Sequence, residues 1–307
     1  MLGRGRRRFP RAGGRLGRDR MHHSWMSLWL ILMLAMPVLI GGGLLWKSWS
    51  LLHDHALGEL LLSTRWRPLS GEFGFAPFIL SSLWVTLVSL LIAGPVCVLS
   101  AIHLTQYAPR IVLKVMQPVT DILAGIPSVI YGVWGIVAIV PLVSRNLAPL
   151  MGAETTGYSI LSGAIVLAVM IIPFVLNILI EIFRSIPIEL QEASLSLGAS
   201  RWYTIKYVTL RKALPGIVSA LGLGLSRAFG ETIAVLMVVG NVTIIPRGVF
   251  QPGYPLPALI ANNYGEMLSI PMYDSALMFG ALILFVIVMV FNLAARLTII
   301  RYEKVSQ

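Results

Sequence analysis

The chain has 307 residues, of which 57% are hydrophobic and only 12% are charged. This composition excludes an ordinary soluble globular domain and predicts a single polytopic membrane domain. The formal net charge of +11 does not indicate nucleic-acid binding, because eight of the 24 basic residues lie within the first 20 positions. Glycines interleave them, and no aromatic stacking surface accompanies them.

The basic N-terminal segment is typical of a juxtamembrane tail. We expect residues 1–24 to form a disordered cytoplasmic tail that contacts anionic lipid, and residues 25–307 to form the transmembrane domain. Met21 is an alternative start that would make the tail dispensable. The one cysteine, Cys97, lies in an apolar run, so we expect no disulfide bond.

Apolar runs of about 20 residues predict six spanning helices. Their expected positions are Leu28–Trp46, Phe78–Leu99, Val119–Val143, Ser159–Ile182, Ile217–Val239 and Ser275–Arg296. The first run is too long for a signal peptide. With the N-terminus inside, the cytoplasmic segments hold 18 basic residues and the external segments five. The positive-inside rule therefore predicts that both termini are cytoplasmic.

Two connecting segments differ in composition from the rest. The external segment 240–274 is rich in proline and glycine, which predicts irregular backbone lying against another part of the protein. The internal segment 183–216 is polar. There Pro187 can start a helix, Glu189 suits its first turn, and Gly198 can end it in a left-handed cap. We expect a short surface helix that docks a cytoplasmic partner.

The fifth apolar run carries two charges, Arg227 and Glu231, at a depth where an ionisable side chain costs at least about 2.5 kcal/mol. Four positions apart, they would share one helical face. Beside them, the small residues Gly222, Ser226 and Gly230 allow another helix to approach and would turn the charged row inward. We hypothesise that Arg227 forms a transient anion site with Glu231 as its resting counter-ion. The alternative is an ion pair that only fixes packing.

The segment Gly125–Ser128 predicts a bend in the third helix, because it contains both glycine and proline. The hydroxyl groups of Ser128 and Tyr131 are then available to a passing anion, although a simple packing kink is the alternative. Asn177, inside the fourth helix, either lines the pathway or bonds a neighbouring helix, and the sequence does not choose between them.

Metal binding and ATP hydrolysis find little support in the sequence. His53, Asp54 and His55 could chelate a metal, but their spacing and the lack of further ligands favour a solvated loop. The chain has no Gly-x-x-x-x-Gly-Lys-Ser/Thr loop for the phosphates of ATP. We expect the chain to bind no cofactor itself.

The internal segment resembles the EAA loop of ABC importer permeases. The matching positions are Glu192, Ala193 and Gly198. Two positions depart from the pattern, because Ser194 replaces the second alanine and Arg211 occupies the place of the final proline. The resemblance implies that this loop carries a coupling helix for an ATPase, with Pro215 left to make the bend that follows.

Further motifs are similar to those of PstC-type permeases of phosphate-specific ABC transport systems. They are Leu123–Gly132, Met170–Pro173, Arg227–Thr232, Met237–Asn241, and the pair Trp66–Pro68 and Glu72–Gly74. Together they cover about Arg65–Glu266. One departure is Pro255–Ala258, where the family usually shows Thr-Leu-Thr.

This resemblance implies an all-α bundle of the type I, MetI-like class in the bacterial cytoplasmic (inner) membrane. It implies a non-enzymatic phosphate-importer subunit that pairs with a PstA-like permease at its fifth helix. The other implied partners are two copies of a PstB-like ATPase, which binds ATP and magnesium, and an external PstS-like phosphate-binding protein. The residues assigned to the substrate pathway are Arg227, Glu231, Thr232, Ser128 and Tyr131.

Other functions remain open at this point. Within the same class, the substrate could be another oxyanion such as sulfate or molybdate. In a different class, the chain would be an ATPase-independent transporter or a membrane scaffold that recruits proteins through the internal loop. Six spans without a detectable internal repeat are few for a secondary transporter. The effect of Arg211, the affinity and any role in phosphate signalling are also open.

Overall fold

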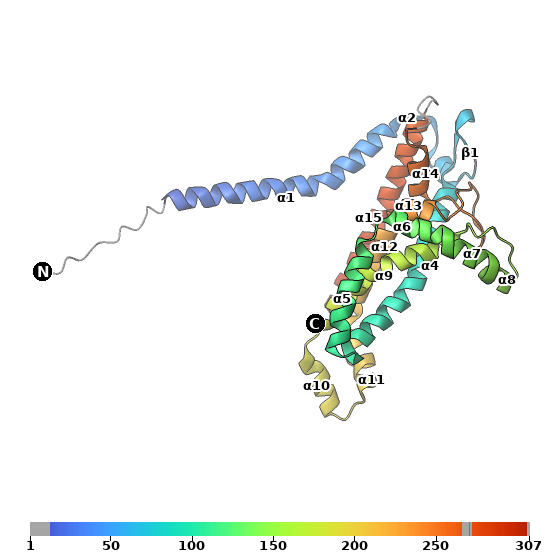
Figure 1. Ribbon diagram of the computed structural model, residues 1–307. Helices are drawn as coiled ribbons and strands as arrows, with labels where there is room; N and C mark the ends of the chain where they lie inside the picture. The colour runs from blue at the N-terminus through green and yellow to red at the C-terminus, as the bar shows by residue number, and fades with distance from the viewer. Residues whose placement is uncertain (1–12, 266–269, 271, 306–307) are drawn as a thin grey trace.

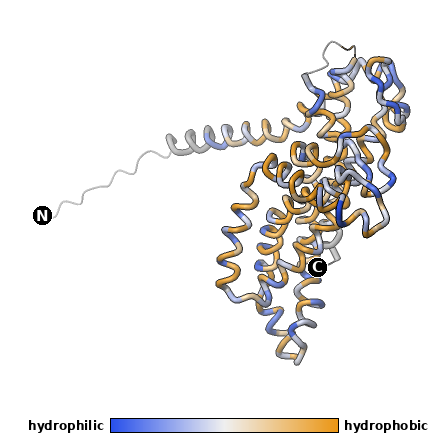
Figure 2. The backbone as a smooth tube through the Cα atoms, turned by 45° about the vertical axis from the view of Figure 1, so that its right-hand side comes forward, coloured by the Kyte–Doolittle hydropathy of each residue, from blue (hydrophilic) through white to orange (hydrophobic). Residues whose placement is uncertain are grey.

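The computed structural model describes residues 13–265, 270 and 272–305, which are mostly helical. Among the described residues, six helical segments are long and apolar enough to cross a membrane, which confirms the predicted number. They are His22–Lys47, Ala76–Tyr107, Ser128–Leu150, Ile160–Arg184, Arg201–Phe229 and Tyr273–Thr298. Figure 2 shows that hydrophobic residues dominate these helices.

The bundle consists of long helices with several short or widened turns between them. The long helices are α1 (Gly13–Lys47), α4 (Ala76–Ile102), α5 (Arg110–Gly125), α9 (Ile160–Arg184), α12 (Leu210–Phe229) and α15 (Tyr273–Val305). The third span combines α6 (Ser128–Trp134), the π-helix η3 (Gly135–Ile139), α7 (Val140–Leu142), the π-helix η4 (Val143–Leu147) and α8 (Ala148–Leu150). Two further π-helices are η2 (His103–Tyr107) and η5 (Ile205–Thr209).

The remaining elements lie at the two ends of the bundle or, for one short helix, beside it (Figure 1). One end, the α14 end, holds α2 (Trp49–Asp54), α3 (Leu57–Leu62), β1 (Trp66–Arg67), the 3₁₀-helix η1 (Pro68–Ser70), β2 (Glu72–Phe73) and α14 (Leu256–Asn263). The other end, the α10 end, holds α10 (Ile188–Ser196) and α11 (Arg201–Thr204). The short helix α13 (Ile233–Leu236) follows α12.

The centre of the bundle is the contact between α4 and α9. Leu167, Ile171 and Val175 of α9 are completely buried. On α4, Ser82 and Thr86 are buried, and their hydroxyls donate to the carbonyls of Phe78 and Ser82 one turn earlier, at 2.9 and 2.7 Å. Hydrogen bonding within the helix removes the cost of burying these hydroxyls, so α4 can pack deep in the bundle.

The α14 end is closed by an aromatic cluster. Trp66 of the short antiparallel pair β1–β2 meets Phe73, Phe75 and Phe78 edge-on, with ring centroids 4.9–5.6 Å apart. Such edge-to-face pairs are favoured by the charge distribution of the rings. The cluster fastens the segment before α4 onto the first turn of α4.

The proline- and glycine-rich segment lies against α4, as the sequence predicts. The Tyr254 N–H donates to Ser81 Oγ at 3.1 Å, and the Leu256 N–H donates to Ser82 Oγ at 2.8 Å. Gly253 donates its N–H to the carbonyl of Val239 at 3.1 Å. The irregular backbone before α14 is therefore held by side chains of α4 and by the carbonyl of Val239, whereas residues 256–263 of the same segment form α14.

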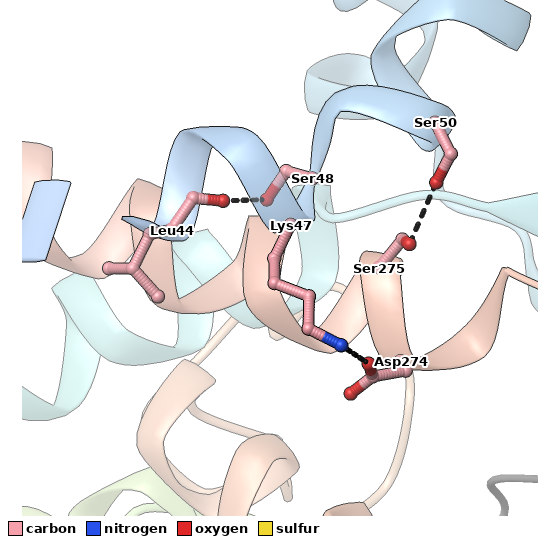
Figure 3. A network of polar contacts seen from close by, with 6 residues as sticks. All are labelled: Leu44, Lys47, Ser48, Ser50, Asp274 and Ser275. Atoms are coloured by element: carbon pink, nitrogen blue, oxygen red, sulfur yellow. Dashed lines mark hydrogen bonds and ion pairs between the residues drawn. The ribbon is translucent and has the colours of Figure 1, made fainter. Parts of the chain in front are cut away.

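Helix α1 leaves the bundle over most of its length (Figure 1). It meets α15 near Gly41, where an ideal Cβ would lie 3.0 Å from the Phe285 ring. At its end, Lys47 Nζ pairs with Asp274 Oδ2 at 2.7 Å, and the Ser50 and Ser275 hydroxyls are 2.8 Å apart (Figure 3). Both pairs tie the start of α15 to the junction of α1 and α2.

Two predicted boundaries are wrong. The tail was expected to be disordered to residue 24, but α1 already begins at Gly13, while residues 1–12 lie outside the described residues. Extending an existing helix costs little, because each added residue gains a hydrogen bond. The third span was expected at Val119–Val143, but α5 ends at Gly125 and the span begins at Ser128. Pro127 lacks an N–H and constrains Ile126 before it, so the helix stops there.

Candidate functional site

The segment between α9 and α11 forms the expected surface helix, α10. Pro187 precedes its first residue and Glu189 stands in its first turn, where a negative charge suits the helix dipole. None of its residues is buried, and Glu192 and Ala193 are both exposed. A nine-residue helix with no buried face is marginal by itself, which fits a docking element.

Gly198 ends α10 as the sequence predicts. Its φ of +84° lies in the left-handed region, and its N–H donates to the Leu195 carbonyl at 2.9 Å. The N–H of the next residue, Ala199, donates to the carbonyl of Ser194 at 3.3 Å. A residue with a Cβ would be strained here, which explains a glycine at this position. Ser194 also exchanges a 2.9 Å hydrogen bond with Thr204 of α11, so it joins α10 to the next helix.

Helix α12 continues through Pro215. Helices α11, η5 and α12 form one span from Arg201 to Phe229, with Pro215 inside α12. A proline removes one backbone hydrogen bond, but spanning helices tolerate this when their neighbours hold them in place. Arg211, at the place of the family's final proline, therefore lies within a continuous helix. Arg201 fastens the start of this span by donating to the Gln106 carbonyl of η2.

The fifth span ends earlier than predicted. Helix α12 stops at Phe229, residues 230–232 are not helical, and α13 begins at Ile233. Arg227 therefore lies in the last turn of α12, whereas Glu231 lies beyond it. The prediction that the two charges share one helical face is wrong, because the helix ends between them. In the described part of the chain the two side chains form no ion pair.

The two charges have separate partners. Glu231 Oε1 accepts from the Ala234 N–H at 3.3 Å, which satisfies a free donor in the first turn of α13. Thr232 donates to the Gly230 carbonyl at 3.3 Å within the same break. The Arg227 guanidinium instead lies over the Phe174 ring of α9, 4.9 Å from its centroid. The aromatic face stabilises the positive charge.

The small residues on α12 pack closely against a neighbouring helix, as expected. The predicted consequence, a charged row that faces inward, is not observed. An ideal Cβ at Gly222 would lie 2.8 Å from Ala295 Cβ of α15, and the Ser226 hydroxyl donates to Asn292 Oδ1 at 2.7 Å. Helix α15 thus covers Gly222 and Ser226, whereas Gly230 follows the end of α12 and is exposed. The neighbouring Leu223 and Arg227 are exposed, so the charged row does not face the interior of this chain's own bundle. A charge on an open face at membrane depth must face a partner or a water-filled path.

Helix α6 packs against the segment that follows α12. The hydroxyl of Tyr131 on α6 donates to the Leu123 carbonyl at 2.7 Å. At Gly132 an ideal Cβ would lie 2.5 Å from Met237 Sδ, so α6 packs directly on the segment around α13. Ser128 is half-buried at the first position of α6, one turn before Tyr131. Tyr131 therefore packs in the same buried cluster as Ala234 of α13, and its hydroxyl bonds the end of α5.

Asn177 bonds a neighbouring helix. Its side-chain Oδ1 accepts from Thr120 Oγ1 at 2.8 Å, and its Nδ2 donates to Asp121 Oδ1 at 3.0 Å. Both partners lie on α5, so Asn177 joins α5 to α9. Asp121 is exposed, and sequence reasoning overlooked it. The available signal was a single acidic residue inside the predicted third span.

Comparison with known proteins identifies the family to which this architecture belongs. Residues 93–303 match the family model described as "Binding-protein-dependent transport system inner membrane component". The chain is 33% identical over 256 residues to the phosphate transport system permease protein PstC of Xylella fastidiosa (strain 9a5c), which covers 79% of this chain and 78% of the relative. It is 32% identical over 302 residues to PstC of Mesorhizobium japonicum, covering 93% and 91%. It is 39% identical over 240 residues to the probable ABC transporter permease protein YqgH of Bacillus subtilis, covering 78% and 76%.

Two solved structures share the fold. A bacterial alginate ABC transporter chain gives a TM-score of 0.61 at 17% identity, over 93% of this chain and 96% of that one. A chain of the MetNI methionine ABC transporter gives a TM-score of 0.53 at 21% identity, over 72% and 93%.

The fold and these likenesses define a multi-pass membrane permease of the ABC importer class, a transport subunit rather than an enzyme. The chain belongs to the family of binding-protein-dependent transport system inner membrane components, and PstC permeases are among its relatives.

Proposed function

We propose that this chain is the PstC-like permease subunit of an ATP-driven importer of inorganic phosphate. The observation that supports this proposal most directly is Arg227, an arginine at membrane depth on an open face. The relatives of the chain include phosphate permeases. The planar guanidinium of arginine donates paired hydrogen bonds to two oxygens of a phosphate. The open face would then be completed by a second, PstA-like permease to enclose the pathway.

The α14 end faces outward and the α10 end faces the cytoplasm in this proposal, with both termini cytoplasmic. This orientation rests on the excess of basic residues in the segments at the α10 end. An external PstS-like protein would deliver phosphate at the α14 end. Two PstB-like ATPase subunits would supply ATP and magnesium chemistry at the other end, since the chain carries no phosphate-binding loop.

The coupling surface is α10 with the turn that follows it. Glu192, Ala193, Ser194 and Gly198 lie there, and the exposed face of α10 offers apolar contacts to a docked ATPase through Leu190. Movement of α10 reaches α11 through the Ser194–Thr204 hydrogen bond. From α11 it passes along one helical span to Arg227. Pro215 lies within this span.

The pathway residues have different roles in this scheme. Arg227 binds the anion. Glu231 holds the start of α13 instead of neutralising Arg227, and Thr232 orders the break between the two helices. Tyr131 and Ser128 border the site from α6, where Tyr131 can exchange its backbone partner for the anion.

Radiolabelled phosphate uptake tests the proposal in cells that lack the gene, restored with the wild-type chain or with Arg227→Lys. We expect the wild type to restore uptake that excess sulfate does not inhibit. We expect Arg227→Lys to reach the membrane but to lose at least about tenfold in uptake, because lysine lacks the fork. Arg67→Lys, an exposed arginine in β1, is the matched control and should transport normally.

Two results would contradict the proposal. Full uptake by Arg227→Lys would remove the need for the guanidinium. A wild-type chain that restores uptake of sulfate or molybdate, but not of phosphate, would keep the permease class and change the substrate.

A further inference from the structure

An acidic residue, Asp121, shares the open face with Arg227. Asp121 lies on α5, eleven residues after that helix begins at Arg110. Its partner Asn177 lies seven residues before the end of the spanning helix α9 at Arg184, so at about 1.5 Å per residue the carboxylate lies roughly 10 Å inside the end of that span. The carboxylate is exposed. A carboxylate at this depth is costly unless it faces a water-filled path.

The positions of Phe174 and Asn177 on α9 relate the two charges to each other. Arg227 covers Phe174, and Asn177 donates to Asp121. Because Phe174 and Asn177 are three residues apart, their side chains leave α9 on one side, with Cβ atoms about 5–6 Å apart. Asn177 is one turn nearer the α10 end of α9. Asp121 therefore follows Arg227 along the same side of the bundle.

The Asp121 carboxylate is held but not neutralised. Its one described hydrogen bond comes from the Asn177 amide at 3.0 Å, and Asn177 is fixed in turn by the Thr120 hydroxyl at 2.8 Å. No basic side chain in the described part of the chain pairs with it. An ionised carboxylate only accepts hydrogen bonds, so its second oxygen is available as an acceptor.

We infer that Asp121 is a specificity-determining residue of the pathway, which accepts a hydrogen bond from the protonated oxygen of hydrogen phosphate after Arg227 has bound its ionised oxygens. This inference rests on the proposed function. Phosphate keeps at least one P–O–H group at neutral pH, whereas sulfate has none. A fixed carboxylate therefore attracts the protonated oxyanion and repels the fully ionised one, because like charges are opposed and no donor compensates them.

The test uses the purified transport complex with its partner permease and ATPase but without the external binding protein, so that selection upstream does not mask selection in the membrane. Equilibrium binding of radiolabelled phosphate is measured with sulfate as competitor. We expect sulfate to compete poorly with the wild-type complex. In Asp121→Asn the amide can donate to sulfate, so the preference for phosphate over sulfate should fall at least tenfold.

Two further variants distinguish a role of the Asp121 carboxylate in selectivity from a role in joining α5 to α9. Asp121→Glu keeps the acceptor and should retain most of the preference. Thr120→Val removes the neighbouring bond between α5 and α9 and should leave the preference unchanged. Both should purify with the partner subunits in normal yield.

The outcomes are distinct. If Asp121→Asn assembles and keeps the wild-type preference, Asp121 only ties α5 to α9 and the inference is wrong. The same conclusion follows if Thr120→Val lowers the preference as much as Asp121→Asn does. If the purified wild-type complex binds no phosphate, Arg227 does not form a phosphate-binding site and the inference about Asp121 is wrong as well. If phosphate uptake in cells nevertheless depends on Arg227, the proposed importer function stands and only the binding site is refuted.

Discussion

Replacing Gly132 with alanine should push α6 away from α13 beside the candidate site. An ideal Cβ at this position lies 2.5 Å from Met237 Sδ and 3.3 Å from Ala234 Cα. The methionine sulfur ends a flexible side chain and can turn away. The Ala234 Cα is backbone, so α13 itself must shift by a few tenths of an ångström. Overpacking of this kind costs about 1–3 kcal/mol.

The matched control is Gly125→Ala, because nothing lies within 4 Å of an ideal Cβ there. Thermal unfolding of the purified complex should show a midpoint lower by several degrees for Gly132→Ala, at about 2–4 °C per kcal/mol in domains of moderate size. Gly125→Ala should match the wild type or exceed it, since alanine favours a helix. Phosphate uptake should fall with Gly132→Ala, because α13 begins directly after the break that follows Arg227. Equal midpoints for the two variants would refute the reasoning.

Two smaller perturbations test the ends of the bundle. Ser82→Ala leaves the buried N–H of Leu256 without its acceptor, so we expect about 1–3 kcal/mol of destabilisation and faster proteolysis of the segment before α14. A thermal midpoint within error of the wild type would contradict this. Lys47→Gln breaks the ion pair with Asp274 at an exposed position. We expect a lower thermal midpoint only at low ionic strength, since salt screens such pairs, and a loss that persists in high salt would argue against a surface ion pair.

The sequence predicts those parts of the structure that depend on local chemistry. Six apolar runs of spanning length correspond to six spans, because a helix must satisfy every backbone group within lipid. The left-handed cap at Gly198 was predictable since only glycine adopts it readily. The sequence also predicted that the proline- and glycine-rich segment lies against another part of the protein, but it did not identify the serine acceptors on α4.

Features that depend on tertiary packing could not be predicted in the same way. The end of α12 at Phe229 has no proline to mark it, and the run continues apolar into α13. The break is held by the Glu231 side chain and by the close approach of α6 at Gly132. The pairing of Asn177 with Asp121 likewise requires α5 and α9 to be adjacent, and the sequence separates these two residues by 56 positions.

The continuity of the fifth span has a mechanical consequence. From Arg201 to Phe229 it contains 29 residues, or about 43 Å of helix, with one end fastened to η2 and the other carrying Arg227. Arg227 therefore lies at the far end of this helical span. Beyond Phe229 three residues are not helical, and α13 packs against α6 and α9. We expect a displacement at the α10 end to reach Arg227 along this span, because the helix is uninterrupted up to Phe229.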